Sequence, residues 1–125
     1  MNMAVRKQDF KRGGIYMVDL GLHKQTSHIQ QGLRPCIVLT SEAGCVFSPV
    51  LSVIPTTSKE LKRIYPTQLH LTPNESNKLN GATTALCEQI VTVPKDRFQF
   101  KIGDLSKEEL DELMNKLSYA LGLSE

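Results

Sequence analysis

The sequence predicts a mostly-β domain of the α+β class: a small antiparallel barrel with a short helix between strands and one C-terminal helix. Two observations favour this class. Short apolar or alternating runs follow one another and are separated by glycine and polar turn residues. A single long amphipathic pattern then closes the chain, from Ser106 to Gly122. With 125 residues, 40% of them hydrophobic, the chain is expected to form one domain over residues 11–125, preceded by an N-terminal extension at residues 1–10.

In the first half of the chain the pattern predicts strands over residues 15–20, 35–40 and 46–54. Pro49 marks a bulge or an edge in the last of these. Residues 42–44 are expected to form a turn. Residues 21–33 form a polar connection that is long for a hairpin, and such loops are often functional.

In the second half the pattern predicts strands over residues 67–71, 82–93 and 98–102. The polar pair Glu88-Gln89 interrupts the second of these, which indicates a bulge, an edge or a site. The segment Thr72-Pro73-Asn74-Glu75 predicts the start of a short helix, because it offers a hydroxyl cap, a proline and a glutamate in capping-box order. Asn80-Gly81 is expected to end that helix.

The C-terminal helix is predicted by its cap and by its apolar stripe. Ser106 and Glu109 have capping-box spacing, and Leu105 and Leu110 occupy the positions of a hydrophobic staple. The residues of the stripe, expected to pack on the sheet, are Leu110, Leu113, Met114, Leu117 and Leu121.

Charge and cysteine content bear on the class of partner and on the cellular compartment. The net charge of +2 does not by itself indicate a nucleic-acid binder, although basic residues gather early and after Thr57 while acids gather on the last helix. The cysteines are odd in number and form no CxxC motif, which favours a reducing cytoplasm; Cys36 and Cys87 are expected in the core and Cys45 at the surface. The start of the chain lacks a signal-peptide pattern, and no run reaches membrane-spanning length, so no membrane partner is expected.

An arginine and neighbouring hydroxyls mark a candidate anion site. Arg34 precedes the apolar run 35–40, and Thr56-Thr57-Ser58 follow the next apolar strand. A buried charge requires a partner, so Arg34 belongs either to an ion pair or to an anion site. Arginine and hydroxyl groups at adjacent strand ends suit a phosphodiester. The alternative for Thr57 is a hydroxyl that only caps its strand.

Several distinct short motifs follow one another along the chain. They are Arg12-Gly13-x-Ile15-Tyr16-x-Val18-Asp19-Leu20, Gly32-x-Arg34-Pro35-x-Ile37-Val38-Leu39, Thr56-Thr57, Pro66-Thr67, Glu88-Gln89-Ile90-x-Thr92, Lys95-x-Arg97 and Gly103-Asp104-Leu105-Ser106. Together they resemble the MazF/PemK (Kid) group of toxin–antitoxin endoribonucleases, over residues 11–123. The resemblance implies an SH3-like barrel, a symmetric homodimer and a cognate MazE-like antitoxin.

The resemblance also implies an activity and a site. Its members, mRNA interferases, cleave single-stranded RNA at short sequences without a metal or other cofactor, leaving a 2′,3′-cyclic phosphate and a 5′-hydroxyl. Arg34 falls on the catalytic arginine, Thr57 on the catalytic hydroxyl residue, and Glu88 where some members carry a catalytic aspartate. Arg34 suits charge stabilisation rather than proton transfer, because it stays protonated. The proton acceptor is left open between Glu88 and His28; alternatively Glu88 makes a dimer or core hydrogen bond, and His28 lies in solvent.

Further residues are expected to bind the RNA substrate: Thr56, Ser58, Gln89, His28, Lys59, Lys62, Arg63 and Tyr65. The lysines could follow phosphates and Tyr65 could stack a base, or Lys62 and Arg63 could serve only solubility. The lead-in Ile29-Gln30-Gln31-Gly32 departs from the usual Glu-Gln-Gly-Gly, which indicates a distinct RNA preference. Two other functions compete: a CcdB-like toxin that binds DNA gyrase without cutting RNA, and an inactive homologue. Arg34 and Thr57 favour the nuclease.

Overall fold

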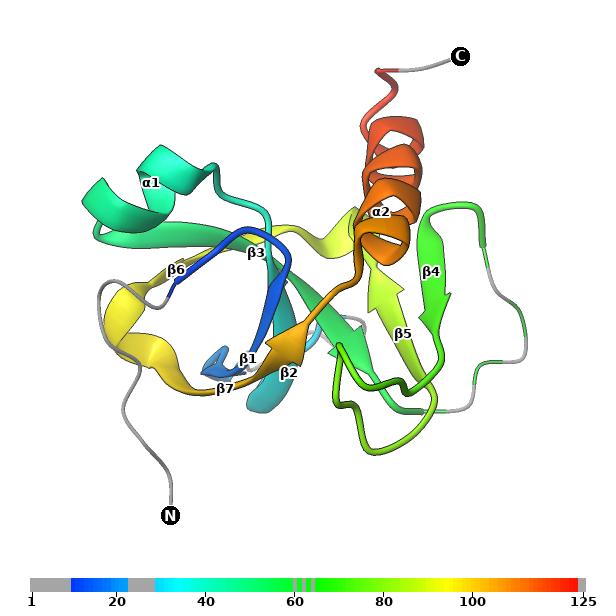
Figure 1. Cartoon of the computed structure of the whole chain (residues 1–125), viewed down its shortest axis with the longest axis horizontal. Helices are drawn as coiled ribbons and strands as arrows, with labels where there is room; N and C mark the ends of the chain where they lie inside the picture. Colours follow the sequence, from blue (N-terminus) through cyan, green and yellow to red (C-terminus); the bar gives the residue numbers. More distant parts are fainter. Residues whose placement is uncertain (1–9, 23–28, 60, 62, 64, 124–125) are drawn as a thin grey trace.

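The computed structural model of the chain describes residues 10–22, 29–59, 61, 63 and 65–123 (Figure 1). Over this part of the chain a 7-stranded antiparallel sheet has the order β4-β5-β3-β2-β1-β7, and β6 also pairs with β3. The strands are β1 (Gly14–Asp19), β2 (Leu33–Val38), β3 (Val50–Thr57), β4 (Gln68–Leu71), β5 (Thr83–Leu86), β6 (Val91–Pro94) and β7 (Phe98–Asp104). The helices are α1 (Glu42–Phe47) and α2 (Lys107–Ala120), and single 3₁₀ turns form η2 (Cys87–Gln89) and η3 (Lys95–Arg97). The predicted mostly-β fold with a C-terminal helix is confirmed.

The central strands bury side chains on both faces. Alternate residues of β1 point into two separate cores: Tyr16 into a cluster with Cys36 and Val53, and Ile15 into a cluster with Ile37 and Ile54. Because successive side chains of a strand point to opposite faces, strands buried on both sides read as continuous apolar runs. The second core lies under α2, whose Leu113 and Leu117 are buried there. Figure 1 shows α2 beside β4 and β5, with α1 at the other end of the molecule.

The strand between residues 46 and 54 begins later than predicted. Residues 42–47 form α1 instead of a turn and the start of a strand, and β3 runs from Val50 through Pro55 to Thr57. The helix forms because the Ser41 hydroxyl accepts a hydrogen bond from the backbone N–H of Gly44 (3.2 Å), which is an N-cap. It turns Cys45 into the core, so the expectation of an exposed Cys45 is wrong.

The core also extends to Phe10, which was assigned to the N-terminal extension. Its ring packs edge-on against Phe98 at 5.0 Å and lies 5.7 Å from the ring of Tyr16.

Within the described residues, no helix is both long enough and apolar enough to span a membrane.

The helix predicted after residue 72 is absent; the segment is a turn built around Asn77. Its fully buried amide donates to the Thr72 carbonyl and to Glu109 Oε2 (both 2.9 Å), and its oxygen accepts from the N–H groups of Asn74 and Leu79 (both 3.0 Å). Asparagine side chains that bond nearby backbone groups compete with helix formation, which explains the error. The short helix between strands is therefore α1, not this segment.

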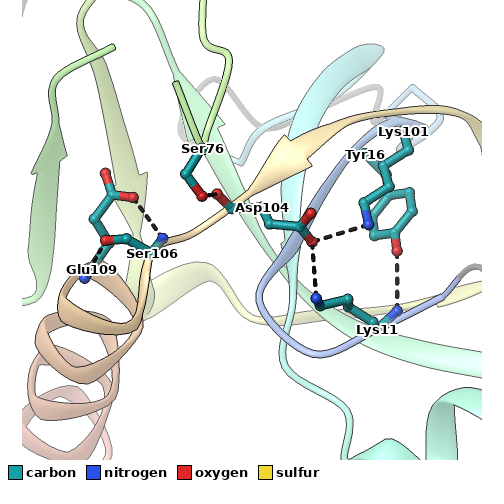
Figure 2. A network of polar contacts seen from close by, with 7 residues as sticks. All are labelled: Lys11, Tyr16, Ser76, Lys101, Asp104, Ser106 and Glu109. Atoms are coloured by element: carbon teal, nitrogen blue, oxygen red, sulfur yellow. Dashed lines mark hydrogen bonds and ion pairs between the residues drawn. The ribbon is translucent and has the colours of Figure 1, made fainter. Parts of the chain in front are cut away.

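Asn77 also attaches this turn to the start of α2. Glu109, which binds Asn77, completes the predicted capping box: it accepts from the N–H of Ser106 (2.8 Å), whose hydroxyl accepts from the N–H of Glu109 (3.1 Å) (Figure 2). Helix α2 ends where Gly122 adopts a φ of 71°. Leu121 is 54% exposed, so the predicted stripe packs on the sheet only as far as Leu117.

A charged cluster joins the end of β7 to the start of β1. Asp104 Oδ1 pairs with Lys101 Nζ at 3.0 Å and with Lys11 Nζ at 3.9 Å, and the N–H of Lys11 donates to the Tyr16 hydroxyl (3.0 Å) (Figure 2). The backbone of Asp104 is held as well, because its carbonyl accepts from the Ser76 hydroxyl (2.7 Å). These contacts link the sheet edge to the turn that carries Asn77.

We predict that Asn77→Ala lowers the free energy of unfolding by about 2–3 kcal/mol, because the substitution leaves buried donors and acceptors unpaired. Urea unfolding followed by circular dichroism measures this change. The exposed Asn80 provides the control, and Asn80→Ala is expected to change the free energy by less than about 0.5 kcal/mol. Equal effects of the two substitutions would contradict the role of Asn77.

The buried thiols of Cys36 and Cys87 are expected to make the free energy of unfolding depend on pH. Burial raises the pKa of Cys36 to about 12 and the pKa of Cys87 to about 11. Because the thiol pKa is higher in the folded state than in the unfolded state, burial of the thiols contributes its full stabilisation below the ordinary pKa of about 8.5. This contribution is lost as the pH rises from there through the raised pKa. We therefore expect the free energy of unfolding to fall between about pH 8.5 and pH 11, and to fall less steeply in Cys36→Ala. An unchanged slope in Cys36→Ala would contradict the assignment.

Candidate active site at the ends of β2 and β3

The pairing of β2 with β3 brings the predicted arginine and threonine together. The antiparallel register pairs Ile37 with Ile54 and Cys36 with Pro55, and its continuation places Arg34 opposite Thr57. A cross-strand hydrogen bond extends the pairing beyond the last registered residues, because the Thr56 hydroxyl donates to the Pro35 carbonyl at 2.7 Å. The two candidate side chains therefore lie at the same end of the sheet, as the sequence predicts.

Arg34 and Thr57 line one pocket, of about 310 Å³. The other lining residues are Ile29, Gln30, Gln31, Ser58 and Lys59. Arg34 is fixed through its Nε, which donates to the Gln31 carbonyl at 3.2 Å, so the terminal guanidinium nitrogens can serve a ligand. Thr57 Oγ1 accepts from the N–H of Lys59 at 3.1 Å, which leaves its own hydrogen for donation. Two hydrogen-bond donors and a nearby lysine make this pocket suited to an anion.

The charge of Arg34 is not balanced by a neighbouring acid among the described residues. No ion pair joins Arg34 to an acid within the described part of the chain. The ion-pair alternative for Arg34 therefore has no partner among those residues, and the charge is directed to the pocket instead.

A second pocket, of about 400 Å³, adjoins the first. Its lining residues are Leu20, Ile29, Gln30, Pro55, Glu88, Gln89, Ile90 and Val91. Ile29 and Gln30 line both pockets and so form a shared wall. The backbone N–H of Gln30 donates to Gln89 Oε1 at 3.0 Å, which holds this wall against η2.

The position of Glu88 differs from the expected grouping with Arg34 and Thr57. Glu88 and Gln89 form η2, the turn between β5 and β6, which pair with successive parts of one edge of β3. This turn sets Glu88 in the second pocket, across the wall from Arg34. Its carboxylate accepts a long hydrogen bond of 3.4 Å from the Gln68 amide.

The expected RNA-binding residues divide into four groups, the last of which is the exposed pair Arg63 and Tyr65. Ser58 and Lys59 line the first pocket, and Gln89 lines the second. Thr56 does not reach either pocket wall: it is 1% exposed and its hydroxyl is used by Pro35, because alternate residues of β3 face opposite sides. His28 and Lys62 lie outside the described residues.

The exposed pair Arg63 and Tyr65 is attached to the second pocket through Gln68. The Arg63 guanidinium lies 5.9 Å from the centre of the Tyr65 ring. The N–H of Tyr65 donates to Gln68 Oε1 at 3.1 Å, and Gln68 in turn contacts Glu88. Sequence reasoning missed Gln68, which is buried at the start of β4. The alternating pattern of residues 67–71 gives a polar residue there but no sign of its burial.

No group of three or more His, Cys, Asp and Glu side chains that could hold a metal ion is found among the residues that the structure describes. The side chains of the first pocket that can donate to an anion are the Arg34 guanidinium, the hydroxyls of Thr57 and Ser58, and the ammonium of Lys59.

Known proteins resemble this chain over most of its length. The family model described as "PemK-like, MazF-like toxin of type II toxin-antitoxin system" matches residues 11–121. Endoribonuclease MazF of Staphylococcus saprophyticus is 30% identical over 113 residues, which cover 90% of this chain and 92% of that protein.

Solved structures share the fold over most of both chains. An endoribonuclease in complex with its cognate antitoxin from a mycobacterial species has a TM-score of 0.73 at 23% identity, covering 92% of this chain and 97% of that one. The Mycobacterium tuberculosis toxin MazF-mt6 has a TM-score of 0.72 at 20% identity, covering 90% and 99%. With the family model matched from β1 to α2, the chain belongs to the PemK-like, MazF-like family of type II toxin–antitoxin toxins.

Proposed function

We propose that the chain is a metal-independent endoribonuclease that cuts single-stranded RNA, mRNA above all, at short specific sequences. The observation that carries the proposal is the pocket that Arg34 and Thr57 both line, at the ends of β2 and β3. Family membership and the S. saprophyticus relative named as an endoribonuclease support it. An anion pocket of this kind suits the phosphodiester that such an enzyme must hold.

The chemistry is internal transesterification. The 2′-oxygen of the ribose forms a bond to phosphorus, the bond between phosphorus and the 5′-oxygen breaks, and one proton leaves the 2′-hydroxyl while another reaches the departing 5′-oxygen. The products are a 2′,3′-cyclic phosphate and a 5′-hydroxyl. The reaction has its nucleophile built into the substrate, so the enzyme contributes mainly positioning and charge stabilisation.

Arg34 and Thr57 supply those contributions. The guanidinium can donate to two phosphoryl oxygens at once, and its charge opposes the negative charge that grows on the pentacoordinate phosphorus. Thr57 can donate its hydroxyl hydrogen to a phosphoryl oxygen or to the 2′-oxygen. The hydrogen bonds from Arg34 Nε to Gln31 and from Lys59 to Thr57 hold both side chains before substrate binds.

Other residues are proposed to guide the RNA. Ser58 and Lys59 extend the first pocket, and the exposed pair Arg63 and Tyr65 offers a charge and a ring for stacking. Gln89 shapes the wall between the pockets. The place of Glu88 in the second pocket supports a role in holding substrate more than a role in proton transfer at the phosphate.

The proposal includes protein partners. The end of α2 and the residues after it expose Tyr119, Leu121 and Leu123, and exposed large apolar side chains are often part of an interface. We assign this surface to a second copy of the chain in a homodimer.

A MazE-like antitoxin is the second partner, by analogy with the Deinococcus radiodurans MazE–MazF and mycobacterial complexes. Free, buried cysteines support residence in the cytoplasm.

The direct test is incubation of the purified protein with defined single-stranded RNA in excess EDTA, with the product ends mapped. We expect cleavage at a restricted set of sequences and 3′ ends that carry a cyclic phosphate, because the 2′-oxygen is the nucleophile. Absence of cleavage would favour the gyrase-binding or inactive alternatives. Products with a 5′-phosphate would exclude internal transesterification.

We predict that Arg34→Ala lowers the single-turnover cleavage rate by about 10²–10³-fold, because a preorganised charge is lost from the transition state. Arg34→Lys is expected to restore only part of the rate, since an ammonium cannot fork onto two oxygens. The exposed Lys107, far along the chain on α2, offers a control cation. A rate for Arg34→Ala equal to that of Lys107→Ala would remove Arg34 from the site.

A further inference from the structure

We propose that the second pocket holds a base next to the scissile phosphate and selects bases with an exocyclic amino group (adenine, cytosine or guanine) over uracil. The inference rests on the proposed function and names the recognition element of that same site. It assigns Glu88 and the side chain of Gln30 to base selection. Three features of the pocket carry it.

The first feature is position. A single stretch of chain, Ile29-Gln30, separates the pocket of Arg34 and Thr57 from the second pocket. In single-stranded RNA each phosphate is flanked by nucleotides whose bases can be splayed out from the backbone. With the phosphate held in the first pocket, a neighbouring base can cross this wall and enter the second.

The second feature is the apolar lining. Leu20, Pro55 and Ile90 present flat or branched hydrocarbon surface to a cavity of about 400 Å³. A base has two apolar faces and a polar edge, and ligand pockets commonly combine an apolar lining with a few polar groups that fix orientation. This lining can cover the faces of a base while leaving its edge to the polar residues.

The third feature is the kind of polar group available. Gln30 Oε1 is buried and receives no hydrogen bond from the residues that the structure describes. Buried acceptors are nearly always paired in folded proteins. Gln30 lines the cavity, so a rotation of its side chain would bring this unpaired oxygen to a donor carried by a ligand. The Glu88 carboxylate is a second acceptor in the same pocket, steadied by the Gln68 amide at 3.4 Å.

Two acceptors define which base edge fits. Adenine, cytosine and guanine each carry an exocyclic amino group that donates to a carboxylate or an amide oxygen. Uracil carries only one edge donor, its N3–H, and its carbonyl oxygens would face the carboxylate. The pocket therefore discriminates against uracil by leaving an acceptor unpaired and by placing like partial charges together.

The wall itself is held by Gln89, which we define as a positioning residue. Its Oε1 accepts from the backbone N–H of Gln30, not from the Gln30 side chain. A substitution of the Gln30 side chain therefore removes the acceptor while the bond that fixes the wall is retained. This separation allows recognition to be tested apart from pocket shape.

The experiment is competitive cleavage of single-stranded RNA with random sequence around the cleavage site, with the cut products sequenced. For the wild type we expect uracil to be disfavoured by at least about tenfold at one position adjacent to the cut. In Glu88→Gln, whose amide can donate to a uracil carbonyl, and in Gln30→Leu, we expect the discrimination at that position to fall to about threefold or less. Glu75→Gln, at an exposed glutamate in the turn before β5, is the matched control and is expected to keep it.

The outcomes separate this inference from the proposed function. Cleavage that tolerates uracil at every adjacent position, or a preference unchanged in both variants, overturns the inference and leaves the nuclease standing. Absence of cleavage of any RNA by the wild type overturns the proposed function itself. If folded Glu88→Gln, checked by its circular dichroism melting curve, loses cleavage of all RNAs more than about 100-fold, Glu88 is a proton-transfer residue and the assignment fails.

Discussion

The candidate site depends on one constraint, the register between β2 and β3. A shift of one residue would turn Arg34 or Thr57 to the opposite face of the sheet, because side chains alternate along a strand. The register is fixed by apolar pairs such as Ile37 with Ile54 and extended by the Thr56 hydroxyl, which donates to the Pro35 carbonyl at 2.7 Å. Thr56 is thus the buried residue that holds the strands, while its neighbour Thr57 faces the pocket.

The same strand, β3, also lies between the elements that form the two pockets. On one edge it meets β2, which supplies the arginine, and on the other it meets β5 and β6, joined by η2 with Glu88 and Gln89. The result is two adjoining pockets, one suited to an anion and one mainly apolar with acceptors at its edge. In the proposed account the first holds the phosphate that reacts and the second selects the base beside it. Strand β3 lines both pockets, through Thr57 in the first and Pro55 in the second.

The sequence predicted the parts of this design that depend on local pattern. The strand periodicity, the capping box of Ser106 and Glu109, and the placement of Arg34 at a strand end follow from short-range rules. Contacts between distant segments were missed: Asn77 donates to Glu109, 32 residues away, and Cys45 is buried because α1 folds over the core. The separation of Glu88 from Arg34 follows from how β5 and β6 share one edge of β3, which no motif reveals.

The central claim is that Arg34 and Thr57 act on one phosphate, and a double-mutant cycle tests it most directly. Single-turnover cleavage of one defined RNA would be measured for Arg34→Ala, Thr57→Val and the double variant. The account predicts strong coupling, with the double variant at least about tenfold faster than the product of the two single effects implies, because both groups stabilise the same transition state. Strictly multiplicative effects, in folded proteins of unchanged stability, would show that the two residues act independently and would contradict the shared site.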